Sequence, residues 1–212
     1  MNTYQKAIDD IKNSLQEQTN QLVVERRSKK NLSKKDFAEI LILCGNYILR
    51  KNGEMINFEI KENMKPVINE LYLYTIGEKY SINSGFCVCG APGVGKTVLM
   101  ASFAMLLRKI GAISGYKQIS ARTFHKISDK DKYEKGVLFI EEFGKNVEIV
   151  KNYGTEEKPM IDLLMSRYET KEITFVDSNF NPQKLNEIYG NLLADRFNQM
   201  FTFIEVNGKS LR

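Results

Sequence analysis

The sequence has few of the residues that build disulfide frameworks and zinc sites. It contains three cysteines, one histidine and no tryptophan among 212 residues. Cys44, Cys87 and Cys89 are odd in number and lack the C-x-x-C spacing of zinc ligands, and His125 stands alone. This pattern argues against a disulfide scaffold, a zinc site and a redox motif.

Long apolar runs are also missing. The longest run near the start, Ile40–Cys44, is too short to cross a bilayer. Residues 1–10 lack the hydrophobic stretch of a secretory signal. We therefore expect a soluble, cytoplasmic protein with no membrane partner.

Composition and charge fit one compact domain with a modest appendage. The chain is 42% hydrophobic, which is enough to bury a core. Its 31 Lys and Arg against 26 Asp and Glu give a net charge of +5. Such a mild excess allows an acidic partner but does not require one.

The front of the chain has the pattern of helices joined by a basic stretch. Apolar spacing predicts an amphipathic helix over Tyr4–Leu22, which could pack on its own domain or dock on another protein. Arg26–Lys35 carries six basic and no acidic residues, as a solvated linker or a phosphate-contacting patch would. Ser33 and Asp36 can cap a second helix, and Gly53 offers its end.

Farther along the chain, helices and strands alternate. Pro66 and Gly77 bound a third helix, and the apolar run Gly85–Cys89 predicts a buried strand. Later helices are expected at Thr97–Ile110, Met160–Tyr168, Leu185–Tyr189 and Leu192–Phe197, and later strands at Tyr116–Ile119, Val137–Ile140, Ile173–Val176 and Phe201–Val206. The alternation predicts an α/β fold, a parallel sheet with helices on both faces.

A phosphate-binding loop joins the first strand to the next helix. Gly90-Ala91-Pro92-Gly93-Val94-Gly95-Lys96-Thr97 matches the P-loop pattern G-x-x-x-x-G-K-[ST]. Its glycines let backbone amides turn toward phosphate oxygens, and the helix dipole adds to the attraction. Lys96 would contact the outer phosphates and the Thr97 hydroxyl would bind Mg²⁺. The four fixed positions arise by chance in roughly one chain of this length in a hundred, so we expect a nucleotide site.

Two carboxylates follow the strand at Val137–Ile140. Hydrolysis of a bound nucleotide needs one carboxylate to anchor the metal's water shell and another to orient the attacking water. Glu141 and Glu142 would emerge at the carboxyl edge of the sheet, where phosphates lie. We assign Glu141 to Mg²⁺ and Glu142 to the water; the alternative is an ordinary acidic turn before Gly144.

Residues 80 to 212 resemble AAA+ ATPases, and within them the bacterial DnaC/IstB-type helicase loaders and transposition helpers. Gly85–Thr97 is similar to the family's first strand and Walker A motif, and Val137–Gly144 to its Walker B motif, in which Asp usually stands at the Glu141 position. Ser166-Arg167-Tyr168 resembles an arginine-tyrosine pair that precedes the sensor strand.

Three further stretches resemble the family's sensor and arginine motifs. Ile173–Asn179 looks like sensor 1, which implies that Asn179 aligns the attacking water with Glu142. Leu193–Phe197 is similar to box VII, which implies that Arg196 reaches into a neighbouring subunit's site. Gly208–Arg212 resembles the motif that carries the sensor 2 arginine, Arg212. Plainer alternatives are that Arg196 pairs with Asp195 or Glu187 and that Arg212 is a frayed end.

The resemblance implies an N-terminal helical region with a basic linker over residues 1–54 and an AAA+ domain over residues 55–212, with a reduced or absent C-terminal lid. It implies an ATP- and Mg²⁺-dependent homo-oligomer that acts in DNA replication as a helicase loader, with the helix at Tyr4–Leu22 contacting a replicative helicase. Single-stranded DNA could contact a short basic segment: Arg122, Lys126, Lys130, Lys132 and Lys135.

Two other functions stay open. One is an IstB-like transposition helper ATPase whose partner is a transposase, because the same core serves both roles. The other is a nucleotide-gated binding module with negligible hydrolysis, because Glu141 is one methylene longer than the usual aspartate. The basic segment is equally consistent with an ordinary solvated loop.

Overall fold

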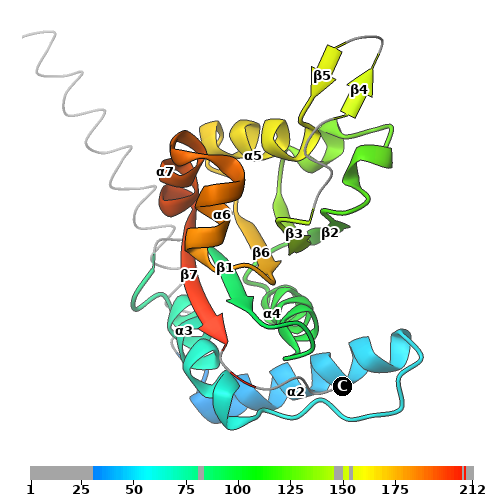
Figure 1. Cartoon of the computed structure of the whole chain (residues 1–212). Helices are drawn as coiled ribbons and strands as arrows, with labels where there is room; N and C mark the ends of the chain where they lie inside the picture. Colours follow the sequence, from blue (N-terminus) through cyan, green and yellow to red (C-terminus); the bar gives the residue numbers. More distant parts are fainter. Residues whose placement is uncertain (1–30, 81–83, 146–149, 153–154, 207, 209–212) are drawn as a thin grey trace, which may run out of the picture.

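The computed structural model describes residues 31–80, 84–145, 150–152, 155–206 and 208 (Figure 1). The helix expected at Tyr4–Leu22 and the sensor 2 residue Arg212 lie outside these residues. None of the described helices has the length and apolar character that a membrane crossing needs.

A five-stranded parallel sheet forms the centre of the molecule (Figure 1). Its order is β2-β3-β6-β1-β7, so the P-loop strand β1 lies between the last two strands of the chain. The strands are β1 (Gly85–Gly90), β2 (Tyr116–Ser120), β3 (Val137–Phe143), β6 (Thr174–Ser178) and β7 (Phe201–Val206). The predicted parallel α/β sheet is confirmed.

Helices cover both faces of the sheet, as the alternation predicts (Figure 1). One face carries α2 (Lys34–Lys51), α3 (Lys65–Ile76) and α4 (Lys96–Lys109). The other carries α5 (Pro159–Glu169), α6 (Pro182–Tyr189) and α7 (Asn191–Met200). Short 3-10 turns lie at Glu62–Met64, Phe124–Lys126 and Asp131–Tyr133.

Alternating side chains of the strands divide the core into two halves. On β1, Phe86 and Val88 face the α2–α3–α4 layer, whereas Cys87 and Cys89 face the α5–α6–α7 layer. Successive strand side chains point to opposite faces, and both faces here are covered. This explains why β1 is an uninterrupted apolar run in the sequence.

The front helix α2 begins and ends where its sequence signals indicate. The Ser33 hydroxyl accepts a 3.0 Å hydrogen bond from the Asp36 amide, and Gly53 after the helix has φ 80°. Phe37 and Leu41 of α2 are fully buried in the same core half as Phe103 of α4. The helix therefore packs directly on the helix that follows the P-loop; the division of the chain at residue 54 stays a prediction.

Two features between residues 140 and 157 were not expected from the sequence. Strand β3 continues past Ile140 to Phe143. A two-stranded antiparallel hairpin, β4 (Val150–Asn152) and β5 (Thr155–Glu157), follows it and is separate from the main sheet. Figure 1 shows the hairpin projecting from the α5 end of the molecule.

A buried arginine on α5 joins the segments that lead into β3 and β6. Arg167 of α5 is 0% exposed, and its Nε donates a 2.8 Å hydrogen bond to the Thr174 hydroxyl. Its terminal nitrogens donate to the carbonyl oxygens of Tyr133, Gly136 and Ile173 at 2.6–2.7 Å. Burial lowers the pKa of Arg167 to about 10, which still leaves the guanidinium charged at neutral pH. This residue fixes the starts of β3 and β6, which carry the candidate site at their other ends.

Candidate nucleotide site

The loop between β1 and α4 needs glycine at its ends. Gly90 has φ 150°, and a Cβ there would lie 2.4 Å from the Val206 carbonyl oxygen of β7. Gly95, the residue before α4, has φ 89° in the left-handed region. Gly93 between them has φ 83°. Larger residues at these positions would strain the backbone or push β7 away.

Helix α4 begins at Lys96, directly after this loop. The first amides of a helix have no partner within the helix, and the aligned peptide dipoles place partial positive charge there. Thr97 occupies the first turn. The loop and the helix start thus have the backbone that the motif requires, and phosphate binding there stays a prediction.

Lys96 is held over the loop by three oxygen atoms. Its Nζ donates to the carbonyl oxygens of Gly90 at 2.7 Å and Ala91 at 2.9 Å, and to Asn179 Oδ1 at 2.9 Å. The residue is only 5% exposed, and burial lowers its pKa, with Asp177 as the largest opposing charge. Asn179 follows β6 in the chain, so the structure brings the P-loop lysine and the predicted sensor 1 residue together.

A β-bulge lies where β3 meets β6. Ile140 pairs with Val176 and Phe143 pairs with Ser178, so Glu141 and Glu142 face the single residue Asp177. Glu142 takes a positive φ of 54°, and its amide donates a 2.8 Å hydrogen bond to Asp177 Oδ1. Bulges of this kind redirect side chains and occur often beside active sites.

The bulge sends the two glutamates in different directions. Glu141 pairs with Ser120 of the edge strand β2 and accepts a hydrogen bond from Gln118 Nε2. Burial raises the pKa of the Glu141 carboxyl. Its assignment to Mg²⁺ stays a prediction, but among the described residues its side chain bonds to Gln118 on β2 rather than to the P-loop.

Glu142 is paired with two cations. Its carboxylate lies 3.0 Å from Lys145 Nζ and 3.6 Å from a terminal nitrogen of Arg122. The hydrogen bond from Lys145 is the main cause that lowers the pKa of Glu142. The side chain remains 32% exposed. Glu142 is therefore ionised at neutral pH, as a water-orienting carboxylate must be.

Asp177 belongs to the candidate site, although no motif in the sequence assigns it a role. It is the last residue but one of β6, beside β1, and is 2% exposed, and its Oδ2 has no hydrogen-bond partner among the described residues. Burial raises the pKa of Asp177, and Thr97 is the group that lowers it most. The sequence does contain a signal for this residue, because the apolar strand predicted at Ile173–Val176 is followed directly by the Asp177 carboxylate.

Arg196 does not contact the loop of its own chain. It extends from α7 to α5, where its Nη1 donates a 2.8 Å hydrogen bond to the Tyr168 hydroxyl and its guanidinium lies 4.8 Å from the ring centre. In the described residues Asp195 is bonded to Gln199 and Glu187 to Lys184, so neither is the partner of Arg196. Its role in a neighbouring subunit's site stays a prediction.

Several basic side chains between β2 and β3 have partners within the chain. Arg122 lies beside Glu142, and Lys132 lies 3.9 Å from Asp129 and over the Tyr133 ring. Lys126 and Lys135 are exposed. The segment therefore borders the candidate site through Arg122, and its predicted contact with single-stranded DNA remains untested.

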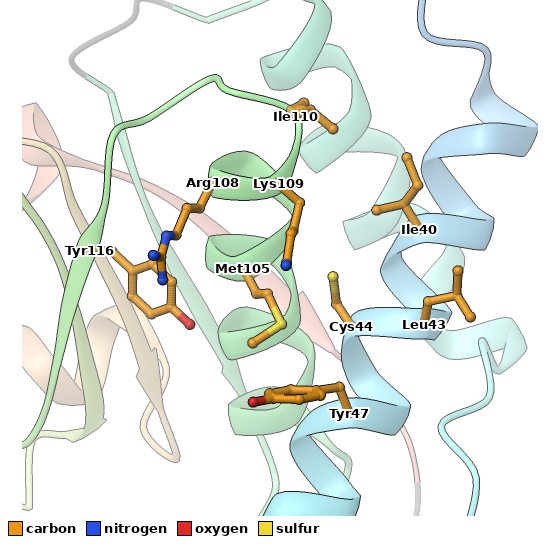
Figure 2. Close-up of a pocket in the computed structure, with 9 residues that line it drawn as sticks. All are labelled: Ile40, Leu43, Cys44, Tyr47, Met105, Arg108, Lys109, Ile110 and Tyr116. Carbon is orange, nitrogen blue, oxygen red and sulfur yellow. The ribbon is translucent and has the colours of Figure 1, made fainter.

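An apolar groove between α2 and α4 is separate from this site (Figure 2). It has a volume of about 490 Å³. Leu43 and Tyr47 on α2 are 62% and 58% exposed at its wall, opposite Met105 of α4. No residue of the P-loop lines it.

Several solved structures have a fold similar to that of this chain. No protein-family model and no curated protein matches the sequence. A putative primosome component from Streptococcus pyogenes serotype M3 has a similar structure, with a TM-score of 0.58, 16% identity and coverage of 72% of this chain and 84% of that chain. The DnaI structure gives 0.56 at 19% identity, covering 74% and 88%. The DnaC helicase loader gives 0.54 at 13% identity, covering 71% and 93%.

The chain therefore shares the fold of the DnaC helicase loader and of DnaI. AMPPCP-bound DnaA from Aquifex aeolicus has the same core, with a TM-score of 0.52 and 18% identity. That match covers 71% of this chain but 49% of the DnaA chain. The predicted P-loop fold class is confirmed, and at these identities the likeness shows the fold alone.

Proposed function

We propose that this AAA+ chain binds and hydrolyses ATP and acts in DNA replication as a loader of a replicative helicase. The observation that carries the ATPase proposal is the position of Lys96. Its ammonium lies between two P-loop carbonyls and Asn179, with Asp177 on the neighbouring strand β6 and Glu142 on β3 beyond it. A nucleotide's phosphates would offer Lys96 stronger, charged acceptors than these neutral oxygens.

Each site residue then has a physical role. The amides of the loop and of the first turn of α4 bind the phosphate oxygens, and the Thr97 hydroxyl is a ligand suited to Mg²⁺. When bound, Mg²⁺ neutralises charge on the outer phosphates. Glu142 orients the attacking water and Asn179 aligns it, a role that the contact between Asn179 and Lys96 supports.

Replacing Glu142 with glutamine tests the hydrolysis step. The change keeps the backbone N–H that Asp177 accepts and removes only the carboxylate charge. We expect ATP to remain bound while the rate of phosphate release falls about 100-fold or more. Glu169→Gln on the exposed surface of α5 is the control and should hydrolyse at the parent rate. Parent-rate hydrolysis by Glu142→Gln would remove this residue from its role.

Arg196 is proposed to complete the site of an adjoining subunit. A guanidinium placed there would offset the charge that spreads over the transferred phosphoryl group. We expect Arg196→Ala to bind ATP normally and to lose at least about 10-fold in turnover. Loss of its contact with the Tyr168 ring costs about 0.5–1 kcal/mol, and loss of its hydrogen bond to the Tyr168 hydroxyl costs up to about 3 kcal/mol. Both are smaller than a domain's total stability of about 5–15 kcal/mol, so the variant should fold.

Mixing two inactive variants distinguishes a shared site from a structural role. Lys96→Ala subunits lack the phosphate contact but carry Arg196, and Arg196→Ala subunits have the reverse defect. Phosphate release should partly recover in the mixture. Arg108→Ala on the exposed part of α4 serves as a control for loss of charge. A mixture as inactive as its components would argue against a site shared between subunits.

The choice of helicase over transposase rests on structural likeness to the DnaC helicase loader and DnaI. A tagged form of the full chain, loaded with ATP, should capture purified replicative helicase from its own cell. Capture of a transposase instead would favour the IstB-like role. The same capture repeated with residues 1–30 removed tests the predicted docking helix, and undiminished capture of helicase would refute it.

One observation favours a nucleotide-gated module as a second candidate. The Glu142 carboxylate already forms ion pairs with Lys145 and Arg122, and these pairs compete with a water molecule for its oxygens. ATP would then shift assembly without being consumed. Phosphate release and oligomer mass, each measured with and without single-stranded DNA, separate the two candidates. Background release together with ATP-dependent assembly would favour the module.

A further inference from the structure

We propose that Asp177 at the end of β6 is the carboxylate that anchors the water shell of Mg²⁺ beside Thr97, in place of Glu141. The inference rests on the proposed binding of MgATP by the loop at residues 90–97. It gives a role in metal binding to a residue on the strand next to the P-loop strand.

The order of the strands places Asp177 nearer to the loop than Glu141. Strand β6 is the direct neighbour of β1, and Asp177 is in register with Val88, two residues before the P-loop begins. Strand β3 is one strand farther away. A carboxylate on β6 therefore reaches the start of α4 without crossing another strand.

The bulge explains why the β3 position does not supply this carboxylate. Because two β3 residues face Asp177, the side chain of Glu141 is directed to Gln118 on β2 and that of Glu142 to Lys145. The Glu142 amide meanwhile donates to Asp177 Oδ1 and fixes the orientation of that carboxyl. The bulge thus directs Glu141 toward β2 and fixes the orientation of the Asp177 carboxyl.

Asp177 also has an unused oxygen. Its Oδ2 is buried without a hydrogen-bond partner among the described residues, and the carboxyl interacts with the Thr97 side chain and the Lys96 charge. Buried polar atoms are nearly always paired, so an unpaired carboxylate oxygen in a phosphate site indicates a missing donor. A water molecule bound to Mg²⁺ is such a donor.

The composition of the site suits Mg²⁺ rather than a metal with a full protein cage. Within the described part of the chain, no group of three His, Cys, Asp or Glu side chains could hold a metal ion. Magnesium in nucleotide sites keeps several waters and takes its remaining contacts from phosphates and one or two protein oxygens. Thr97 and Asp177 meet that need.

The test measures how much magnesium strengthens nucleotide binding. A fluorescent ATP analogue is titrated into the full chain with Mg²⁺ and again with EDTA, and the ratio of the two Kd values is compared among variants. Asp177→Asn keeps an oxygen acceptor for the Glu142 amide and should reduce this ratio about 10-fold or more. Glu141→Gln should keep most of it, and Glu169→Gln is the neutral control.

A second readout follows the metal itself. Mn²⁺ replaces Mg²⁺, and electron paramagnetic resonance counts the Mn²⁺ held by each variant in the presence of ADP. Asp177→Asn should release Mn²⁺ at concentrations where Glu141→Gln retains it. Melting curves for every variant verify folding, and Asp177→Ser replaces Asp177→Asn if the latter does not fold.

The outcomes are separable. Loss of the magnesium effect in Glu141→Gln, or its retention in folded Asp177 variants, would overturn the inference. Glu141 is less buried than Asp177, so its variant is informative even if substitutions at Asp177 prevent folding. Failure of the unaltered chain to bind the ATP analogue with either Mg²⁺ or EDTA would instead overturn the proposed function.

Discussion

Lys96→Ala is expected to weaken ATP binding about 10- to 150-fold, because it removes the buried P-loop cation that we propose to contact the phosphates. Hydrogen bonds to charged groups are worth about 1.5–3 kcal/mol each, which corresponds to that range of Kd. Titration with a fluorescent ATP analogue in the presence of Mg²⁺ measures the effect.

The structure also defines the control for this change. Lys109 lies at the other end of the same helix and is exposed, so Lys109→Ala should bind ATP like the parent chain. Lys96 also holds the carbonyls of Gly90 and Ala91, and a melting curve must show that the variant is folded. An unchanged Kd in folded Lys96→Ala would mean that the loop does not bind the phosphates.

Arg167→Met is expected to lower the free energy of unfolding by about 3–5 kcal/mol, the largest effect on stability that the structure suggests. Methionine fills a similar volume but donates nothing, so the carbonyl oxygens of Tyr133 and Gly136 and the Thr174 hydroxyl lose the donor that Arg167 provides. The Ile173 carbonyl oxygen also loses Arg167 but keeps a 3.1 Å hydrogen bond from the Leu138 amide. Each buried group left unpaired costs about 1–3 kcal/mol, partly offset because the cation no longer has to be buried. Denaturation by urea, followed by circular dichroism, measures the change.

Arg108→Met on the exposed end of α4 is the matched control, and its unfolding free energy should change by less than about 0.5 kcal/mol. A domain's total stability is about 5–15 kcal/mol, so Arg167→Met could be folded only in part at 37 °C. Equal stability of the two variants would show that the hydrogen bonds of Arg167 contribute little to the fold.

The motif with the strictest backbone requirements could be located from the sequence. Glycines that need positive φ, a lysine and a helix start are all local features, so Gly90–Thr97 was placed correctly between β1 and α4. The cap at Ser33 and the end of α3 at Gly77 are local in the same sense. Pairing between strands is not local, so the sequence could not show that Glu141 and Glu142 share one partner residue.

The same limit explains the residues whose roles were missed. Arg167 and Asp177 act through segments that lie next to them only in the fold: Arg167 through Tyr133 and Gly136, and Asp177 through Glu142. A charge next to an apolar strand indicates a sheet edge, but it does not say which neighbour the charge meets. That information comes from the strand order β2-β3-β6-β1-β7.

Calorimetric titration of the unaltered chain with ATP and with AMP, both with Mg²⁺, tests the central claim most directly. If the loop at residues 90–97 binds the outer phosphates, ATP should bind saturably at one site per chain. AMP lacks those phosphates and should bind at least about 10-fold more weakly. Equal affinity for the two nucleotides, or no saturable binding of ATP, would contradict the account.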